Sequence, residues 1–209
     1  MPQQISSLLW FFMFCLVAIT LPHFFPSEAQ IINHLFDHGL QLLHLRKPGA
    51  EPRLVQRLLE DVNPAYRPQI TIHYHHDLAA RYALGGVHLS RSHPSAPTSW
   101  QGRVSVSCHS FAEVQRFRSC SDYVFLSPIF DSISKSGYSS AFSTSILLSH
   151  SSLIDSRLIA LGGVLPCHVP FLSRLCFGGA AVLGGLWADA SESSVLRNFH
   201  SYVSQVNAL

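Results

Sequence analysis

Short apolar segments recur along this chain, and each is followed by a segment with helical spacing or by a polar connection. We predict eight buried strands, at residues 15–20, 40–45, 69–73, 86–89, 104–108, 123–126, 157–161 and 180–183. We predict helices at residues 26–38, 52–61, 77–83, 110–118, 144–153, 168–175 and 192–206. This alternation favours an α/β fold with a single closed (β/α)8 TIM barrel, and a doubly wound open sheet is the alternative.

The length and composition fit one barrel domain. The chain has 209 residues, of which 47% are hydrophobic and only 12% are charged, so it can bury one substantial core. A net charge of +2 without a run of Lys or Arg excludes an electrostatic footprint for nucleic acid. The five cysteines include no C-x-x-C pair, which favours reduced thiols and a cytoplasmic location.

The N-terminus carries an uncharged apolar run at residues 8–21, which could be a signal segment or a membrane anchor. No Lys or Arg precedes the run, and its length is marginal for spanning a bilayer. Its second half reads as the first barrel strand. We therefore expect no membrane association, an apolar extension at residues 1–12 and one barrel domain at residues 13–209.

Polar side chains gather where the predicted strands end, which is where the working groups of such barrels lie. They are His44, Arg46, Lys47, His73, Ser107, His109, Ser132, Ser134 and Lys135. Cationic and hydroxyl groups of this kind bind phosphate oxygens. The last two strands run into Gly162-Gly163 and Gly184-Gly185, whose backbone N–H groups can approach an anion closely. The alternative is that these glycines only relieve crowding in tight turns.

Six segments in order resemble the thiamine phosphate synthase/TenI family, from about residue 16 onward. They read LHLRKP at 43–48, GVHLS at 86–90, SVSCHS at 105–110, DYVFLSPIFDSISKSG at 122–137, ALGGV at 160–164 and GGAAVLGGLW at 178–187. The resemblance implies a transferase that joins hydroxymethylpyrimidine pyrophosphate to thiazole phosphate, giving thiamine phosphate and pyrophosphate. The implied partners are phosphorylated small molecules, and a homo-oligomer is an open possibility.

The resemblance also implies roles for individual residues. Arg46 and Lys135 would hold the pyrophosphate, and Ser107 would contact it or the pyrimidine cation. His44, Lys47 and His73 stand at positions on the pyrophosphate side of the family site and are expected to bind substrate. The thiazole phosphate would be held by Ser132, Ser134, Gly162, Gly163, Gly184 and Gly185.

The chain departs from the family at the positions of the expected Mg2+ ligands. The family's Asn-Asp after the third strand is His73-Tyr74 here, and its second Asp is His93. Mg2+ prefers oxygen ligands, so the resemblance implies this cofactor while the usual carboxylates are absent. Asp77 and Asp131 are nearby candidates, and no metal ligand is assigned.

Two other functions stay open. The TenI branch tautomerises a carboxythiazole phosphate with a histidine in the loop after strand six, where this chain has Pro128. A tautomerase would need a substitute acid or base such as His44, His73 or His109. The other alternative, of a different class, is a barrel that binds thiazole or thiamine phosphates without turnover.

Histidines are numerous, and three of them crowd residues 73–76. They could form a transition-metal or proton-transfer site, or they could simply bond to backbone groups near the strand end. His73 and His75 would point the same way in an extended strand, but the sequence names no third ligand. We expect ordinary backbone-bonded histidines here, and we expect His88 to be a packing residue within its strand.

Overall fold

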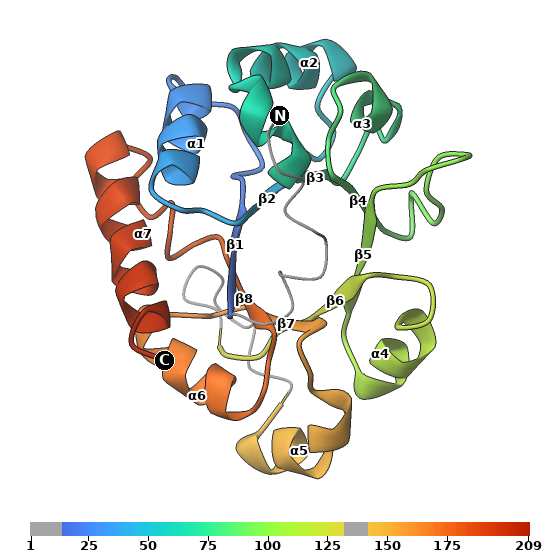
Figure 1. The fold of residues 1–209 in the computed structure, drawn as a ribbon, viewed down its shortest axis with the longest axis vertical. Helices are drawn as coiled ribbons and strands as arrows, with labels where there is room; N and C mark the ends of the chain where they lie inside the picture. Colours follow the sequence, from blue (N-terminus) through green and yellow to red (C-terminus); the bar gives the residue numbers. More distant parts are fainter. Residues whose placement is uncertain (1–13, 132–141) are drawn as a thin grey trace, which may run out of the picture.

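The computed structural model describes residues 14–131 and 142–209, and they form a closed barrel of eight parallel strands in sequence order (Figure 1). The strands are β1 (Cys15–Ile19), β2 (Leu42–Leu45), β3 (Ile70–Ile72), β4 (Gly86–Leu89), β5 (Arg103–Cys108), β6 (Tyr123–Leu126), β7 (Leu158–Leu161) and β8 (Gly179–Val182). The barrel closes where β1 pairs with β8, with Val17 opposite Ala181. The predicted (β/α)8 barrel is confirmed.

Helices surround the barrel (Figure 1). They are α1 (Glu28–Asp37), α2 (Pro52–Asp61), α3 (Asp77–Arg81), α4 (Phe111–Phe117), α5 (Thr144–Ser149), α6 (Val169–Arg174) and α7 (Glu192–Val206), with 3-10 turns η2 (Pro64–Gln69), η3 (Ser151–Leu153) and η4 (Pro166–His168). Between β4 and β5, residues 90–102 form turns and a Ser90–His93 bridge. The helix predicted at residues 144–153 is divided into α5 and η3.

The start of α4 shows how local sequence fixes an element. The Ser110 hydroxyl accepts a hydrogen bond from the backbone N–H of Glu113, at 3.2 Å. The Glu113 carboxylate in turn accepts one from the backbone N–H of His109, at 2.6 Å. These bonds satisfy N–H groups that a helix start leaves without partners, so the predicted N-cap is confirmed.

Two hydrophobic clusters lie on the two faces of the sheet. The larger cluster fills the layer between the strands and the helices, and the smaller one fills the barrel interior with residues such as Val17, Leu42, Phe125 and Ile159. Because successive strand residues point to opposite faces, the polar residues of the same strands are also divided between the two layers. His44 therefore points inward, between the outward-facing Leu43 and Leu45.

The second half of the N-terminal apolar run belongs to the barrel. β1 forms the first strand and pairs with both β2 and β8, as the strand interpretation predicted. Over residues 14–131 and 142–209, no helix is long and apolar enough to cross a bilayer. The predicted extension at residues 1–12 lies outside the described residues.

Gly163 occupies a backbone position that we expect to tolerate no side chain. Its φ is +63°, and a Cβ there would lie 2.7 Å from the Phe130 carbonyl oxygen and closer still to that of Asp131. We predict that Gly163→Ala lowers the free energy of unfolding by more than about 2 kcal/mol, since strain and overlap add.

Gly49→Ala is the matched control, because Gly49 has φ +70° and a Cβ there would meet no atom within 4 Å. It should cost only the strain of a left-handed backbone, about 1 kcal/mol. Urea unfolding of both variants measures the difference. An equal loss of unfolding free energy in the two variants would show that the close approach to residues 130–131 does not contribute to the effect.

Candidate active site

The carboxyl ends of β1 and β2 are tied together beside the barrel mouth. The Thr20 hydroxyl accepts a hydrogen bond from the backbone N–H of Arg46 at 2.9 Å and donates one to the carbonyl oxygen of Arg46 at 3.2 Å. This pair of hydrogen bonds fixes the backbone at Arg46, whose side chain is half-buried. Arg46 thus lies where the sequence predicted a cation for phosphate.

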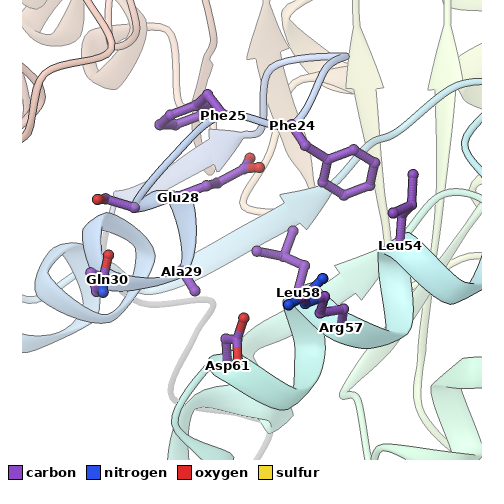
Figure 2. A pocket seen from close by; sticks show the side chains of 10 residues that line it. Phe24, Phe25, Glu28, Ala29, Gln30, Leu54, Arg57, Leu58 and Asp61 are labelled. Carbon is purple, nitrogen blue, oxygen red and sulfur yellow. The ribbon is translucent and has the colours of Figure 1, made fainter.

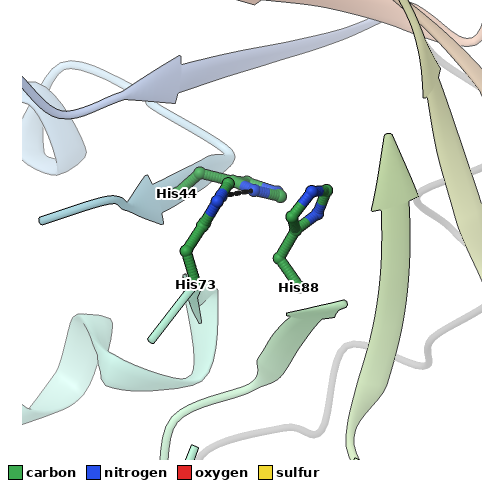
Figure 3. A group of neighbouring side chains, drawn as sticks. All are labelled: His44, His73 and His88. Carbon is green, nitrogen blue, oxygen red and sulfur yellow. Dashed lines mark hydrogen bonds between the residues drawn. The ribbon is translucent and has the colours of Figure 1, made fainter. Parts of the chain in front are cut away.

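Three histidines from neighbouring strands meet inside the barrel (Figure 3). His44 belongs to β2, His88 belongs to β4, and His73 directly follows β3. The three residues expose only 0%, 3% and 8% of their surfaces in the order His44, His88 and His73, and one nitrogen from each lies within 4.8 Å of the others. His44 Nδ1 is 2.9 Å from His73 Nε2, and the His73 and His88 rings stack at 4.1 Å.

Hydroxyl groups extend this histidine cluster (His44, His73 and His88) deeper into the barrel and toward its mouth. The Tyr123 hydroxyl lies 2.6 Å from His44 Nε2 and also bonds to Ser105. The Ser105 hydroxyl lies 2.8 Å from His88 Nδ1, and the half-buried Ser107 hydroxyl lies 3.0 Å from His88 Nε2. A continuous hydrogen-bonded path therefore leads from His73 through Tyr123 to Ser107.

Burial keeps the imidazoles of the histidine cluster neutral. Removal from water lowers the pKa of His44 and of His73 well below the usual 6.5, and lowers the pKa of His88 to about 3. The positive charge of Arg46 acts in the same direction on His73. Burial raises the pKa of Tyr123 to about 12, so its hydroxyl keeps its proton. Neutral imidazoles can accept and donate protons or bind a metal.

The crowded segment at residues 73–76 does not act as one unit. β3 ends at Ile72, and His75 turns away with φ +55°, placing its Nε2 2.8 Å from the Ala50 carbonyl oxygen. The ring of His76 bonds to the carbonyl oxygen of His88 at 3.1 Å. The expectation of backbone-bonded histidines holds for these two. It was wrong for His73, whose ring bonds to His44. His88 is buried within β4, as we expected of a packing residue, and its ring bonds to Ser105 and Ser107.

Lys47, which we expected to bind substrate, is buried with its ammonium against the β1–α1 connection. Its ammonium donates to the carbonyl oxygens of Leu21 and His23, at 2.9 and 2.7 Å, and to the Glu28 carboxylate at 2.6 Å. An ammonium has three donors, so in this arrangement none is left for a phosphate. Lys47 instead holds the β1–α1 connection against β2.

The first glycine pair packs beneath the loop that follows β6. Gly162 has φ +94°, and its carbonyl oxygen accepts a hydrogen bond from the N–H of Phe130 at 3.0 Å. In the second pair, Gly184 is exposed, while a Cβ on Gly185 would lie 2.5 Å from the Tyr202 hydroxyl. Close packing accounts for Gly162 and Gly185. Phosphate binding by either pair stays a prediction, and Ser132, Ser134 and Lys135 lie outside the described residues.

The side chains at the expected Mg2+ positions do not suit Mg2+. The rings of Tyr74 and His93 lie edge to face at 5.6 Å, and His73 belongs to the histidine cluster. Asp77 and Asp131 are exposed. Within the described part of the chain, the one group of three or more ligand side chains is the histidine cluster, which contains no carboxylate. We therefore derive no chemistry through Mg2+.

Sequence reasoning missed Tyr123, Ser105 and the role of His88. The sequence did contain a signal for them. Each of the three is a polar residue at an inward position of its strand, in register with inward polar residues of the neighbouring strands. Ser105 is opposite both His88 and Tyr123 in the ladders of β4–β5 and β5–β6. Alternation alone could have grouped them, but not shown which atoms touch.

A groove of about 500 Å³ lies outside the barrel, between α1 and α2 (Figure 2). Phe24 and Phe25 of the β1–α1 connection line it, together with Leu54, Arg57 and Leu58 of α2. It holds no group of nucleophiles or metal ligands among its lining residues. The chemistry of the described chain is therefore concentrated inside the barrel mouth.

Comparisons with known proteins agree with this fold. The sequence model of the family described as thiamine monophosphate synthase (TMP-TENI) matches residues 16–186. A solved thiamine phosphate pyrophosphorylase from Bacteroides thetaiotaomicron is 35% identical with a TM-score of 0.84, covering 92% of this chain and 98% of its own. A second, from Pyrococcus furiosus, shares the fold at 15% identity and a TM-score of 0.74, covering 93% and 96%.

A search of curated proteins finds no match. The family match nevertheless covers well over half of the sequence, and the 35% identical structure is matched over nearly its whole length. The chain therefore belongs to the thiamine monophosphate synthase family.

Proposed function

We propose that this protein is a thiamine phosphate synthase, a transferase that joins hydroxymethylpyrimidine pyrophosphate to thiazole phosphate. The observation that carries the proposal is the 35% identity, over 92% of this chain, to a protein named thiamine phosphate pyrophosphorylase. The half-buried Arg46 and Ser107 at the barrel mouth are groups suited to phosphorylated substrates.

The reaction needs stabilisation of a leaving anion more than a strong base. The bond between the pyrimidine methylene carbon and pyrophosphate breaks, and both electrons leave with pyrophosphate. The thiazole nitrogen then donates its lone pair to the carbon to form the new C–N bond. In this proposal Arg46 and Lys135 bind the departing pyrophosphate, and Ser107 donates a hydrogen bond to it.

The thiazole phosphate would bind on the opposite side of the mouth, near the ends of β7 and β8. Gly162, Gly163, Gly184 and Gly185 remain the proposed backbone site, with Ser132 and Ser134 as hydroxyl donors. The rigid packing of Gly163 against the loop after β6 supports this placement, since it holds the two loops together.

Replacing Arg46 tests the synthase proposal. We predict that Arg46→Ala lowers the rate of thiamine phosphate formation about 100-fold or more, because a charge-assisted contact to the leaving group is lost. The control is Arg174→Ala, at the exposed end of α6. The assay supplies both substrates and measures thiamine phosphate and pyrophosphate. Absence of product with the folded parent protein would refute the synthase.

A second function is favoured by the hydrogen-bonded path of imidazoles and hydroxyls, namely tautomerisation of a carboxythiazole phosphate. Such a reaction moves a proton between two positions of the substrate, and His73 lies at the mouth end of the path. If this is the activity, His44→Gln should slow the reaction at least about 100-fold, whereas His38→Gln on the exposed end of α1 should not. Proton exchange on the substrate, followed by NMR, distinguishes this activity from synthesis.

A further inference from the structure

We propose that His44, His73 and His88 bind a transition-metal ion of the Zn2+ class inside the barrel mouth. The proposal goes beyond thiamine phosphate synthesis and does not depend on it. Three imidazoles supplied by neighbouring strand ends, each nearly or fully buried, are brought within 4.8 Å of one another (Figure 3). Three protein ligands with a position left open is the arrangement of reactive zinc sites.

The approach of His44 to His73 is the first geometric argument. Two ring nitrogens face each other at 2.9 Å, so their lone pairs repel unless a proton or a metal ion lies between them. Two nitrogens bound to tetrahedral Zn2+ at its usual bond length lie about 3.3 Å apart. For this pair, a separation larger by on the order of 0.4 Å would match the bond lengths of the ion.

The surrounding hydroxyls give the second argument, because they orient the rings. His44 can donate from Nε2 to the Tyr123 oxygen at 2.6 Å, and His88 can donate from Nδ1 to the Ser105 oxygen at 2.8 Å. With those protons outside, Nδ1 of His44 is left to face His73, and Nε2 of His88 is left as an acceptor, here for the Ser107 hydroxyl at 3.0 Å, which a metal ion would replace. An outer hydrogen bond from each metal-bound histidine is the usual support of such sites.

The donor set selects the metal. Neutral imidazoles suit Zn2+, Co2+, Ni2+ and Cu2+, whereas Mg2+ and Ca2+ need oxygen ligands. A 2+ ion held by three neutral ligands leaves an open position for water, hydroxide or a phosphate oxygen. The Ser107 hydroxyl, 3.0 Å from His88 Nε2, and the nearby cation Arg46 mark the side from which a phosphate or hydroxide would enter.

Metal uptake by the full-length protein tests the proposal directly. The protein, with any affinity tag removed, is stripped with a chelator, dialysed against Zn2+ or Co2+, and analysed for metal per chain. We expect one ion per chain, a Co2+ absorption band of the intensity typical of four-coordinate sites, and a higher melting temperature with Zn2+. A folded parent protein that retains neither ion would overturn the proposal.

Two variants locate the ion. His44→Gln and His73→Asn keep a polar side chain of similar or smaller size at each position, so folding should be retained, as circular dichroism checks. Each variant should lose the Co2+ absorption band and bind the metal ion at least tenfold more weakly. The exposed control His38→Gln should keep the band and the affinity of the parent protein. Unchanged uptake in both variants would place the ion elsewhere and refute the site.

Tyr123→Phe separates metal binding from a purely structural role. It removes only the Tyr123 hydroxyl, which bonds to His44 and also to Ser105, and loss of such an outer partner lowers metal affinity about 10- to 100-fold. We expect this loss together with a retained one-to-one stoichiometry. An affinity equal to that of the parent would show that the Tyr123–His44 bond does not serve a metal site, and would count against the proposed ring orientation.

Discussion

Replacing Lys47 by Met is expected to lower the free energy of unfolding by about 3–5 kcal/mol, because it leaves a buried carboxylate without its cation. The side chains of Lys47 and Glu28 are 1% and 2% exposed and lie 2.6 Å apart. The carbonyl oxygens of Leu21 and His23 would lose their donor as well. Urea unfolding measures the loss.

The double variant Lys47→Met/Glu28→Leu separates a charge effect from a packing effect. Among the described residues, Glu28 Oε2 has no hydrogen-bond partner. Removing both charges therefore removes the ion pair, but it also removes the free-energy cost of burying this oxygen. We expect the double variant to recover at least half of the lost stability. A double variant that recovers none of the stability lost in Lys47→Met would mean that the ammonium contributes mainly through its two backbone carbonyl contacts.

Acid is expected to destabilise the metal-free protein steeply below about pH 6.5, the usual pKa of an unfolded histidine. Burial lowers the pKa of His44, His73 and His88 in the folded state, so the unfolded chain binds more protons in this range. Stability is therefore full above pH 6.5 and is lost as pH falls toward about 3, the pKa of His88.

Each such imidazole contributes up to about 1.4 kcal/mol per pH unit, and three together up to about 4 kcal/mol per pH unit. Between pH 6.5 and pH 5.5 the loss is therefore up to about 4 kcal/mol, a large part of the stability of an ordinary domain, about 5–15 kcal/mol. Protein freed of metal by a chelator is unfolded with urea at pH 7.5, 6.5 and 5.5. The slope of the free energy of unfolding against pH is then compared between the parent protein and His73→Asn. The variant should take up about one proton fewer on unfolding. Equal slopes would mean that His73 is already charged in the fold.

Much of the fold was predictable because its signal is local. The strand at residues 123–126 was identified with the bounds of β6, and Ser110 was identified as the cap of α4. Apolar runs, helix starts and glycine stops each depend on a few consecutive residues. The helix predicted at residues 144–153 was less accurate, because its pattern is weak and the chain forms a 3-10 turn after Ser149.

The site was predictable only in part. Strand ends located Arg46, His44 and Ser107 at or just inside the barrel mouth, because parallel strands bring their carboxyl ends to one side. The same rule misplaced Lys47, since it says which residue follows a strand but not which way a long side chain turns. Here the partner that decides the direction is Glu28, on a different element.

The sequence by itself determined the alternation of strands and helices, the barrel, and the family to which the chain belongs. The tertiary structure decided that His44, His73 and His88 touch, and that Tyr123 and Ser105 orient them. The reason is physical: alternation assigns a side chain to the inside of a barrel, but strand tilt and stagger determine which inward residues share a layer. Contacts between residues far apart in sequence arise only when the barrel closes.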